Sequence, residues 1–547
     1  MRATDSPGPR PAEAAFAAEL HRVRPELDAG FAAELPGARA AVLARLWRAL
    51  HLEPLPLSPV DRPRLSGPDR RAYDIGAPDP GYAVRLGTTA YTHPAALLEA
   101  VRLPGADALL GEIEHSVVSL ALSRAGARAH SERKPISSTN SIGPIGPIGP
   151  IDSAGAGLIA AERSIVDGHP YHPCCRSRPG FSVADQLAYA PEHGADVELE
   201  LIAVPEQDAL LVGAWPEALR DRPSGTLLLP AHPWQARTVL HPLGFAPSGR
   251  RLTAAPLMSV RTLAPLAAGP HLKTSLSLRM TSSIRDISGG SVRNALAVSG
   301  LLDAVVGRLG GSLRITRNLA SCAALLDAEP APELAVIVRQ SPAEGLRDGE
   351  RVLPLAALAE RPPADVDPAE WLAAFARLTW PALLRLLDWG VALEAHGQNL
   401  LVVLDRSDRP RRLVYRDLAD IRVSPARLAR AGIDHPPVTG HVVSDDPVEL
   451  RRKLFGSLVG GAFGGLVSGF GGGDRSVEAR LWHTVAAEAR AAATQVLHDP
   501  ADRRALLHEP LPLKALTLMR LDGATPGDRW TTADNPLAPS GGQPQSW

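Results

Sequence analysis

The sequence predicts an α+β protein made of several domains, and three observations carry this prediction. The 547 residues exceed what one hydrophobic core usually holds, so two to four domains are expected. Apolar residues recur at helical spacing near the N-terminus and alternate with polar residues in the middle of the chain. The C-terminal third combines a β-hairpin with helical segments. We therefore expect an N-terminal helical domain, a central mixed-sheet domain and a mostly helical C-terminal domain, spanning 1–154, 155–362 and 363–547.

Helical patterns dominate the first region. Residues 12 to 60 predict helices that end at Pro-rich turns, and residues 95 to 129 predict another helical stretch. Residues 137–152 then contain Ile-Gly-Pro three times over. Because proline removes amide donors and glycine adds chain entropy, we expect an exposed linker there.

Strand-like alternation marks the second region. Residues 197 to 204 alternate, residues 226 to 229 form a short buried strand, and residues 272 to 280 alternate again. Residues 291 to 302 predict a helix with a serine N-cap. A Pro-rich stretch from 362 to 368 then marks the next boundary.

The third region begins with a predicted helix over 370–389. A β-hairpin follows, with strands at 399–404 and 412–415 joined by a polar turn at 405–410. The remainder is expected to be mostly helical.

Composition narrows the function classes. The 58 basic residues balance 59 acidic ones, so no basic stripe suggests nucleic-acid binding. Three cysteines make no disulfide framework. Residues 1–10 lack the apolar core of a secretory signal, and the apolar segment 458–470 is too short to span a bilayer. We expect a cytoplasmic protein without a membrane partner. Only four of the basic residues are lysines, at 134, 273, 453 and 514, and such scarcity draws attention to each.

The hairpin carries the sharpest candidate site. Glu394, His396 and Asn399 precede its first strand, and Asp417 follows its second. Because a hairpin returns its ends to one edge, these side chains should converge. A carboxylate and an amide oxygen beside a nucleotide suit magnesium, and His396 could contact a phosphate. Kinase-like phosphotransferases share this layout. The alternative is that the polar residues merely cap the hairpin.

A second candidate lies on the segment 272–285. With a period of two, one face carries Lys273, Ser275, Ser277, Arg279 and Thr281, with Ser282 and Arg285 just beyond. Cations and hydroxyls suit phosphate or carboxylate oxygens. An ordinary solvated sheet face is the alternative.

A third candidate is the loop 168–182, which holds His169, His172, Cys174, Cys175 and Arg178. Zinc is a weak alternative here, because adjacent cysteines chelate one ion poorly and no second ligand pair follows. Anion binding by histidine and arginine on a stiff loop fits better. The segment 232–235 (His-Pro-Trp-Gln) is either a similar polar turn or a structural one. The glycine-rich run 460–473 lacks the Lys-Ser/Thr of a phosphate loop and is equally explained by close packing.

Together these segments resemble the siderophore synthetases that work without a nonribosomal peptide template, of the aerobactin-synthetase type. The ordered matches span about residues 168 to 466 and are Gly168-His169-Pro170 with His172 and Arg178, Tyr189-Ala-Pro191-Glu192, His232-Pro233-Trp234-Gln235, Lys273 with Thr281, Ser282 and Arg285, Glu394-x-His396-Gly-Gln398-Asn399, and Arg416-Asp417.

The resemblance implies a cupped hand with a helical thumb, a fingers domain and a palm, often dimeric. It implies ATP between fingers and palm, with citrate or a related acid as substrate. It places His169, Lys273, Thr281, Ser282, Arg285 and His396 near the nucleotide or substrate. It places Glu394, Asn399 and Asp417 near Mg²⁺.

The implied activity is an ATP- and magnesium-dependent ligase for siderophore biosynthesis and hence iron acquisition. A carboxylic acid would be activated as its acyl-adenylate and passed to an amine, hydroxylamine or alcohol, with His169, Lys273, Arg285 and His396 taking part in catalysis. Two alternatives stay open: a kinase-like phosphotransferase and a non-catalytic nucleotide- or carboxylate-binding protein.

Overall fold

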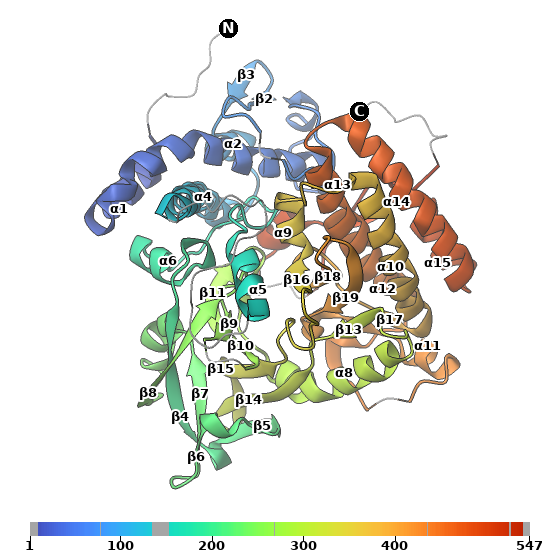
Figure 1. The fold of residues 1–547 in the computed structure, drawn as a ribbon. Helices are drawn as coiled ribbons and strands as arrows, with labels where there is room; N and C mark the ends of the chain where they lie inside the picture. Colours follow the sequence, from blue (N-terminus) through green and yellow to red (C-terminus); the bar gives the residue numbers. More distant parts are fainter. Residues whose placement is uncertain are drawn as a thin grey trace.

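The computed structural model places helices and sheets of three successive chain regions next to one another (Figure 1). Residues of all three regions line one cavity. The structure describes residues 9–76, 78–133, 153–266, 269–434, 436–523 and 527–539. The predicted α+β class is confirmed. The Ile-Gly-Pro linker lies outside the described residues, so it stays a prediction.

The N-terminal region is helical, as predicted. Its long helices α2 and α4 pack together, and a small three-stranded sheet lies beside them. The predicted helical stretch 95–129 is two helices, because Arg102 ends the first in a left-handed conformation (φ 51°). The elements are α1 Pro11–Val23, α2 Asp28–Leu52, β1 Leu65–Ser66, β2 Val84–Leu86, β3 Thr89–Tyr91, α3 Pro94–Val101 and α4 Asp107–Arg133.

The central region is built on a nine-stranded antiparallel sheet in the order β5-β14-β15-β10-β9-β8-β4-β7-β6. The predicted helix 291–302 is longer and is capped by Ser288, whose hydroxyl accepts from the Ser291 amide. The elements are α5 Ser153–Arg163, α6 Val183–Tyr189, β4 Val197–Pro205, β5 Ala209–Gly213, β6 Arg220–Asp221, β7 Thr226–Ala231, α7 Pro233–Gln235, β8 Pro247–Pro256, β9 Thr262–Pro265, β10 His271–Thr274, β11 Leu276–Met280, β12 Ser283–Arg285, α8 Gly289–Gly307, β14 Asn318–Leu326 and β15 Glu329–Arg339.

The single strand predicted over 272–280 is two strands in different sheets. β10 lies inside the large sheet, whereas β11 forms a separate hairpin with β12. The break falls at Ser275, whose hydroxyl donates to the Pro332 carbonyl (2.6 Å). The prediction that one continuous face presents every polar residue of this segment was therefore wrong.

The predicted hairpin is confirmed in the C-terminal region as β18 Leu400–Leu404 and β19 Pro410–Tyr415. β13 (Leu313–Ile315) pairs in parallel with β19, and β16 (Arg351–Pro354) pairs antiparallel with β18. Two strands from before residue 362 thus complete the hairpin sheet, while the domain boundaries themselves stay a prediction. The other elements are α9 Leu355–Glu360, α10 Pro368–Trp389, β17 Val391–Ala392, β20 Arg422–Val423, α11 Pro425–Arg430, α12 Pro447–Phe455, α13 Gly464–Gly471, α14 Arg475–Val496, α15 Pro500–Leu507, β21 Leu511–Lys514, α16 Leu516–Leu521 and β22 Trp530–Ala533.

The glycine-rich run is a packing surface. It belongs to a π-helical segment (Gly456–Phe463) followed by α13. A Cβ on Gly460 would lie 2.6 Å from the Leu513 side chain, and one on Gly464 would lie 2.6 Å from Tyr73.

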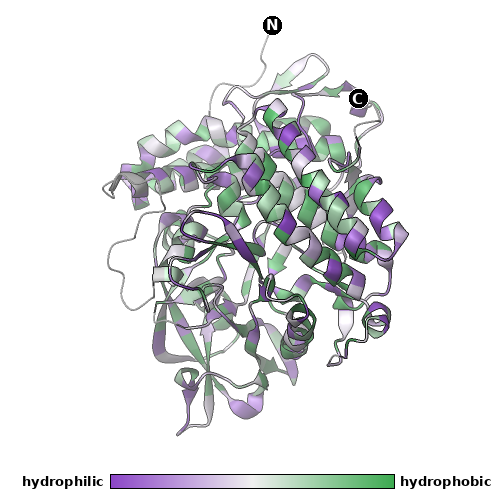
Figure 2. Cartoon of the chain, turned by 45° about the vertical axis from the view of Figure 1, so that its right-hand side comes forward, coloured by the Kyte–Doolittle hydropathy of each residue, from purple (hydrophilic) through white to green (hydrophobic). Residues whose placement is uncertain are grey.

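The helical stretch 447–471 is long and apolar enough to cross a membrane. However, 72% of its most apolar 18-residue segment is buried inside the protein, as in the core helix of a globular protein. Figure 2 shows apolar residues concentrated on the inward faces of the C-terminal helices.

Candidate functional site

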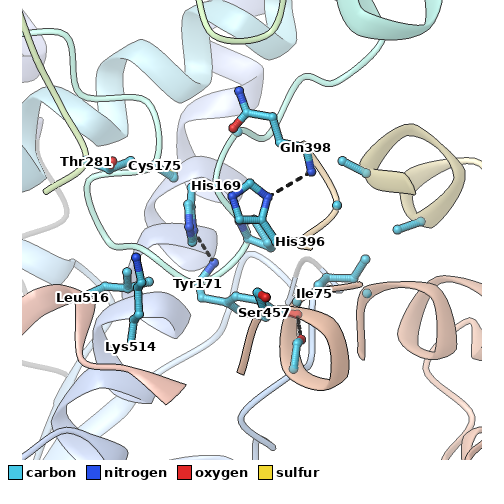
Figure 3. A pocket seen from close by; sticks show the side chains of 18 of the residues that line it. Ile75, His169, Tyr171, Cys175, Thr281, His396, Gln398, Ser457, Lys514 and Leu516 are labelled. Carbon is cyan, nitrogen blue, oxygen red and sulfur yellow. Dashed lines mark hydrogen bonds between the residues drawn. The ribbon is translucent and has the colours of Figure 1, made fainter. Parts of the chain in front are cut away.

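One cavity of about 1250 Å³ lies where the three chain regions meet. Its walls come from α2 and the residues after it, from the loop 167–178, from the β11–β12 hairpin, from the open end of the β18–β19 hairpin and from the glycine-rich helix (Figure 3). All nine residues predicted for the site line it: His169, Lys273, Thr281, Ser282, Arg285, Glu394, His396, Asn399 and Asp417.

A buried ion pair joins the central sheet to the hairpin. Lys273, 5% exposed on β10, donates to both carboxylate oxygens of Asp417 at 2.7 and 2.9 Å. Arg339 of β15 donates to the same carboxylate at 3.3 Å. Burial raises the pKa of Asp417, but Lys273 and Arg339 outweigh it and hold that pKa well below its usual range. Burial lowers the pKa of Lys273 to about 8, against the opposing effect of Asp417.

The hairpin holds its polar ends together, as its sequence predicts. The Arg416 amide donates to the Asn399 carbonyl (3.0 Å), which closes the open end of the two strands. The Arg416 side chain pairs with the buried Glu162 of α5 at 2.5 Å. Asp417 then takes a left-handed conformation (φ 70°) immediately after β19.

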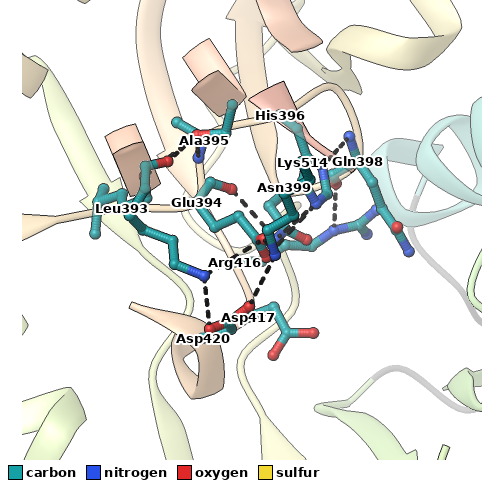
Figure 4. Close-up of polar contacts among 12 residues, drawn as sticks. Leu393, Glu394, Ala395, His396, Gln398, Asn399, Arg416, Asp417, Asp420 and Lys514 are labelled. Carbon is teal, nitrogen blue, oxygen red and sulfur yellow. Dashed lines mark hydrogen bonds and ion pairs between the residues drawn. The ribbon is translucent and has the colours of Figure 1, made fainter. Parts of the chain in front are cut away.

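His396 is oriented as a neutral donor toward the cavity. Its Nδ1 accepts from the Gln398 amide (3.2 Å), so the ring proton lies on Nε2, and burial lowers its pKa. Asn399 Nδ2 lies 3.4 Å from both His396 Nε2 and the Glu394 carbonyl. Figure 4 shows Glu394, Asn399 and Asp417 gathered on this side of the hairpin.

Two lysines that the sequence reasoning did not assign complete this part of the site. Lys514 donates to Glu394 (2.6 Å), and Lys453 donates to Asp420 (2.8 Å) and Asp528 (3.1 Å). Three of the four lysines in the chain thus line one cavity. Their scarcity among arginines was the signal that could have found them. We call this group the lysine end, consisting of Lys273, Lys453, Lys514, Glu394, Asp417, Asp420 and Asp528.

The two histidines of the loop 168–182 have different surroundings. His169 lines the cavity, and its Nδ1 accepts from the Tyr171 amide (3.2 Å), which leaves Nε2 as a donor. Burial, followed by the neighbouring His172 and His396, lowers its pKa well below the usual value. His172 is fully buried and instead contacts the Ser282 hydroxyl through Nε2 (3.1 Å). Of the two, His169 faces the cavity and His172 fixes the position of Ser282.

The tip of the β11–β12 hairpin is strained. Thr281 has φ 57°, a conformation that β-branched residues rarely adopt. Its hydroxyl accepts from Arg285 (2.7 Å), which also donates to the Met280 carbonyl (2.8 Å). Val260, the other β-branched residue with positive φ among the described residues, lines the same cavity.

Several polar residues predicted near the site hold structure instead. Ser277 is bound by Gln235 and Asp286, and Arg279 contacts only the Ser282 carbonyl, at 3.4 Å. Neither lines the cavity.

The loop 168–182 is anchored in the same way. Fully buried Glu192 accepts from Arg178 (2.8 Å) and from Ser123 of α4 (2.6 Å), which ties this loop to the N-terminal helices. His232 is buried, stacked on Phe181, and lies off the cavity, so the segment 232–235 is a structural turn.

The lysine end, together with the neighbouring Arg285, His169, His396 and Asn399 of the cavity lining, fits a nucleotide with magnesium. Lysine, arginine and histidine N–H groups suit phosphate oxygens. Asp417, Glu394 and the Asn399 amide oxygen suit Mg²⁺, which proteins commonly hold through one or two carboxylates plus phosphates. Among the described residues, no three His, Cys, Asp or Glu side chains gather into a protein-only metal cage, and so the zinc alternative gains no support.

Comparison with protein families finds two matches along the chain. Residues 157–360 match the IucA / IucC family. Residues 369–526 match the model described as ferric iron reductase FhuF-like transporter. Together these matches cover the central sheet, the hairpin and most of the C-terminal helices.

Individual relatives agree with the first match. The chain is 26% identical to the L-2,3-diaminopropanoate–citrate ligase of Staphylococcus aureus, over 60% of this chain and 65% of that protein. The chain spans about half to two thirds of the length of the curated relatives it matches.

Solved structures share the fold. The petrobactin biosynthesis protein AsbB of Bacillus anthracis superposes with a TM-score of 0.73 at 19% identity, covering 93% of this chain and 98% of that one. ATP-bound aerobactin synthetase IucA of Klebsiella pneumoniae gives 0.69 at 17% identity, covering 92% and 99%.

Proposed function

Because the chain belongs to the IucA / IucC family of siderophore synthetases that work without a nonribosomal peptide template, we propose that it is an ATP-dependent ligase of siderophore biosynthesis. It activates citrate or a related carboxylic acid and joins it to an amine, hydroxylamine or alcohol. The observation that carries the proposal is that nine residues from distant chain segments line one cavity around the Lys273–Asp417 pair.

The proposed reaction has two steps. A carboxylate oxygen of the acid attacks the α-phosphorus of ATP, which forms the acyl-adenylate and releases pyrophosphate. The nucleophile then attacks the acyl carbon, releasing AMP and a proton. No protein nucleophile is required, so the task of the chain is to position reactants and stabilise developing charge.

Residues that line the cavity divide the work of this scheme. Lys273 and Arg285 neutralise charge on the phosphates and the attacking carboxylate, and Thr281 holds Arg285 in place. His169 and His396 donate hydrogen bonds through Nε2 without adding charge. Mg²⁺, when bound through Asp417, Asn399 and Glu394, would supply electrostatic stabilisation of the phosphates.

The assignment of the three chain regions to named parts of a hand-shaped enzyme is also part of this proposal. The N-terminal helices, the central sheet and the C-terminal region correspond to a thumb, fingers and palm of a cupped hand, with ATP between fingers and palm. A cytoplasmic homodimer remains the expected state.

A product assay tests the proposal. Purified protein is incubated with ATP, Mg²⁺ and a panel of di- and tricarboxylic acids, with and without amines and hydroxylamines. We expect AMP and pyrophosphate in equal amounts, dependent on the acid. Stoichiometric ADP with a phosphorylated product would instead establish the kinase-like phosphotransferase. Ligand binding without any turnover would establish the non-catalytic alternative.

A further inference from the structure

A second group of cations lines the cavity away from the lysine end. Arg45 and Arg48 come from α2, and Arg70 comes from the segment that follows β1. None of them belongs to the residues assigned above to ATP, Mg²⁺ or the activated acid. We call Arg45, Arg48 and Arg70 the arginine end.

Arg48 is buried without a carboxylate partner. It is 3% exposed, its Nε donates to the Ala72 carbonyl (2.6 Å), and its guanidinium lies 4.8 Å above the centre of the Tyr171 ring. Its Nη1 has no hydrogen-bond partner. The buried Glu53 is near enough to favour its charge, but among the described residues no carboxylate lies within ion-pair distance of it. A buried guanidinium in this state is costly unless an anion completes it.

Arg70 shares this condition. It donates to the Asp74 and Gly76 carbonyls, its Nε is buried without a partner, and no ion pair forms to it from the described residues. Arg45 donates mainly to the carbonyls of the loop 167–170, and its nearest carboxylate is Asp167 at 3.8 Å. Backbone carbonyls therefore orient all three arginines, and within the described residues only Arg45 has a carboxylate at ion-pair distance.

The excess of cationic residues in the cavity lining and the volume of the cavity both favour binding of an anionic reactant here. Twelve Lys and Arg residues line the cavity against eight Asp and Glu residues, although the whole chain has a net charge of −1. The cavity of about 1250 Å³ also exceeds the ~300–1,000 Å³ that encloses one drug-sized ligand. More than one reactant can therefore occupy it.

We propose that Arg48 and Arg70 form a second anion subsite, which binds a carboxylate of a reactant other than the carboxylate being activated. The subsite rests on the proposed ligase function and narrows its substrate class. The carboxylate has two possible sources: a non-reacting carboxylate of a polycarboxylic acid, or the carboxylate of an amino-acid nucleophile. In either case a bare polyamine gains nothing from this end of the cavity.

Kinetics with matched substrates separate the two sources. Arg48→Met and Arg70→Met remove the charge and keep much of the side-chain volume. ATP–pyrophosphate exchange measures the acid alone. Condensation with ornithine and with 1,4-diaminobutane, which lacks only the carboxylate, measures the nucleophile. Arg475→Met is the control, because this exposed arginine of the same cavity is already paired with Asp69.

We expect at least a tenfold rise in KM for the reactant whose carboxylate is held, with KM for ATP unchanged and partial rescue by Arg48→Lys. A rise for the acid in exchange identifies the acid as the source. A rise for ornithine but not for 1,4-diaminobutane identifies the nucleophile. Constants within twofold of wild type, or equal losses for every substrate and ATP, overturn the subsite.

A binding measurement keeps the test independent of turnover. Thermal stabilisation by citrate and by ornithine is compared between the wild-type protein and the Arg48→Met and Arg70→Met variants. Loss of stabilisation by one of these ligands supports the subsite even if the wild-type protein exchanges no pyrophosphate, a result that would overturn the ligase proposal alone. Unchanged stabilisation by both ligands overturns the subsite.

Discussion

The two ends of the cavity handle buried charge in opposite ways. At the lysine end every lysine has a carboxylate within ion-pair distance, and Asp417 accepts from both Lys273 and Arg339. At the arginine end the hydrogen bonds of Arg48 and Arg70 go to backbone carbonyls, and neither has a carboxylate of the described residues within ion-pair distance. A cation that is already paired must give up its carboxylate when an anionic ligand binds. An unpaired cation gains its first direct anionic partner from the ligand. The first arrangement suits a reacting group, and the second suits a group that is only held.

Backbone strain follows the same division. Val260, Thr281 and Asp417 have positive φ and line the cavity, and Asp417 belongs to the lysine end, whereas none of the three arginines of the arginine end has positive φ. Such strain persists where the surrounding structure enforces it and is concentrated at functional sites. The comparison thus predicts that changes at the lysine end affect turnover most.

The largest effect is expected from Asp417→Asn. Asparagine tolerates the left-handed backbone at this position, so the fold should be kept while the charge facing Lys273 and Arg339 is lost. We expect a loss of activity of at least ~100-fold, the scale for removing a transition-state stabiliser. Steady-state rates over a magnesium titration measure it. A wild-type rate at matched magnesium would remove Asp417 from the site.

Lys273→Ala comes next. Loss of one charge-assisted contact costs roughly 1.5–3 kcal/mol, so we expect about a 10- to 150-fold loss in kcat/KM for ATP. Lys134→Ala changes the one lysine to which no role is assigned; it is the matched control and should behave as wild type. Equal kinetics of the two variants would show that the lysine end plays no part in ATP use.

The pH profile sharpens the contrast between lysine and arginine. Burial, with help from Arg261 and Arg339, lowers the pKa of Lys273 to about 8. Since the cation is the active form, kcat/KM should decline as pH rises through about 8 and reach about one tenth of its plateau one pH unit above. A phosphate bound beside Lys273 raises the pKa of its amine. The decline in kcat, which reports the enzyme–substrate complex, should therefore occur at a higher pH than the decline in kcat/KM.

Lys273→Arg is the check on this assignment, because guanidinium keeps its charge throughout the range. It should lack the alkaline decline even if its rate is lower. An identical decline in this variant would assign the titration to another group.

The smallest effect is expected from Thr281→Gly. Glycine removes the strain of φ 57°, worth about 1–3 kcal/mol, but adds chain entropy in the unfolded state of up to about 1 kcal/mol. We expect a net gain in stability of about 1 kcal/mol and a several-fold loss in activity, because Arg285 loses its hydroxyl partner. Thermal unfolding and kinetics measure the two. A lower melting temperature for Thr281→Gly would contradict the inference that the Thr281 backbone is strained.

Sequence periodicity correctly predicted the helices and hairpins that are determined by interactions between residues close in sequence. The β18–β19 hairpin and α10 follow from their periodicity and turn residues, and the convergence of Asn399 and Asp417 follows from hairpin geometry. The break at Ser275 was missed because the Pro332 carbonyl that captures its hydroxyl lies far along the chain. Ser277 was misassigned for the same reason, because Gln235, which binds its hydroxyl, is also distant in sequence.

Tertiary packing decides the rest. His169 and His172 share one motif, yet only packing makes the first line the cavity and buries the second against Ser282. Arg45 and Arg48 were read only as part of a helix. Their spacing of three places them on one face of α2, together with the buried Ala41 and Ala49. Arginines on a buried apolar face were the available signal.

Because lysine is scarce in this chain, reagents that modify primary amines can report on the cavity selectively. Three of its four primary-amine side chains line one cavity. Burial lowers the pKa of Lys273 to about 8, so a large part of this amine is unprotonated at mildly alkaline pH. An acylating reagent used sparingly there should label Lys273 first, and ATP should protect it. Peptide mass mapping of the four positions would then report occupancy of the cavity directly, in an otherwise arginine-dominated background.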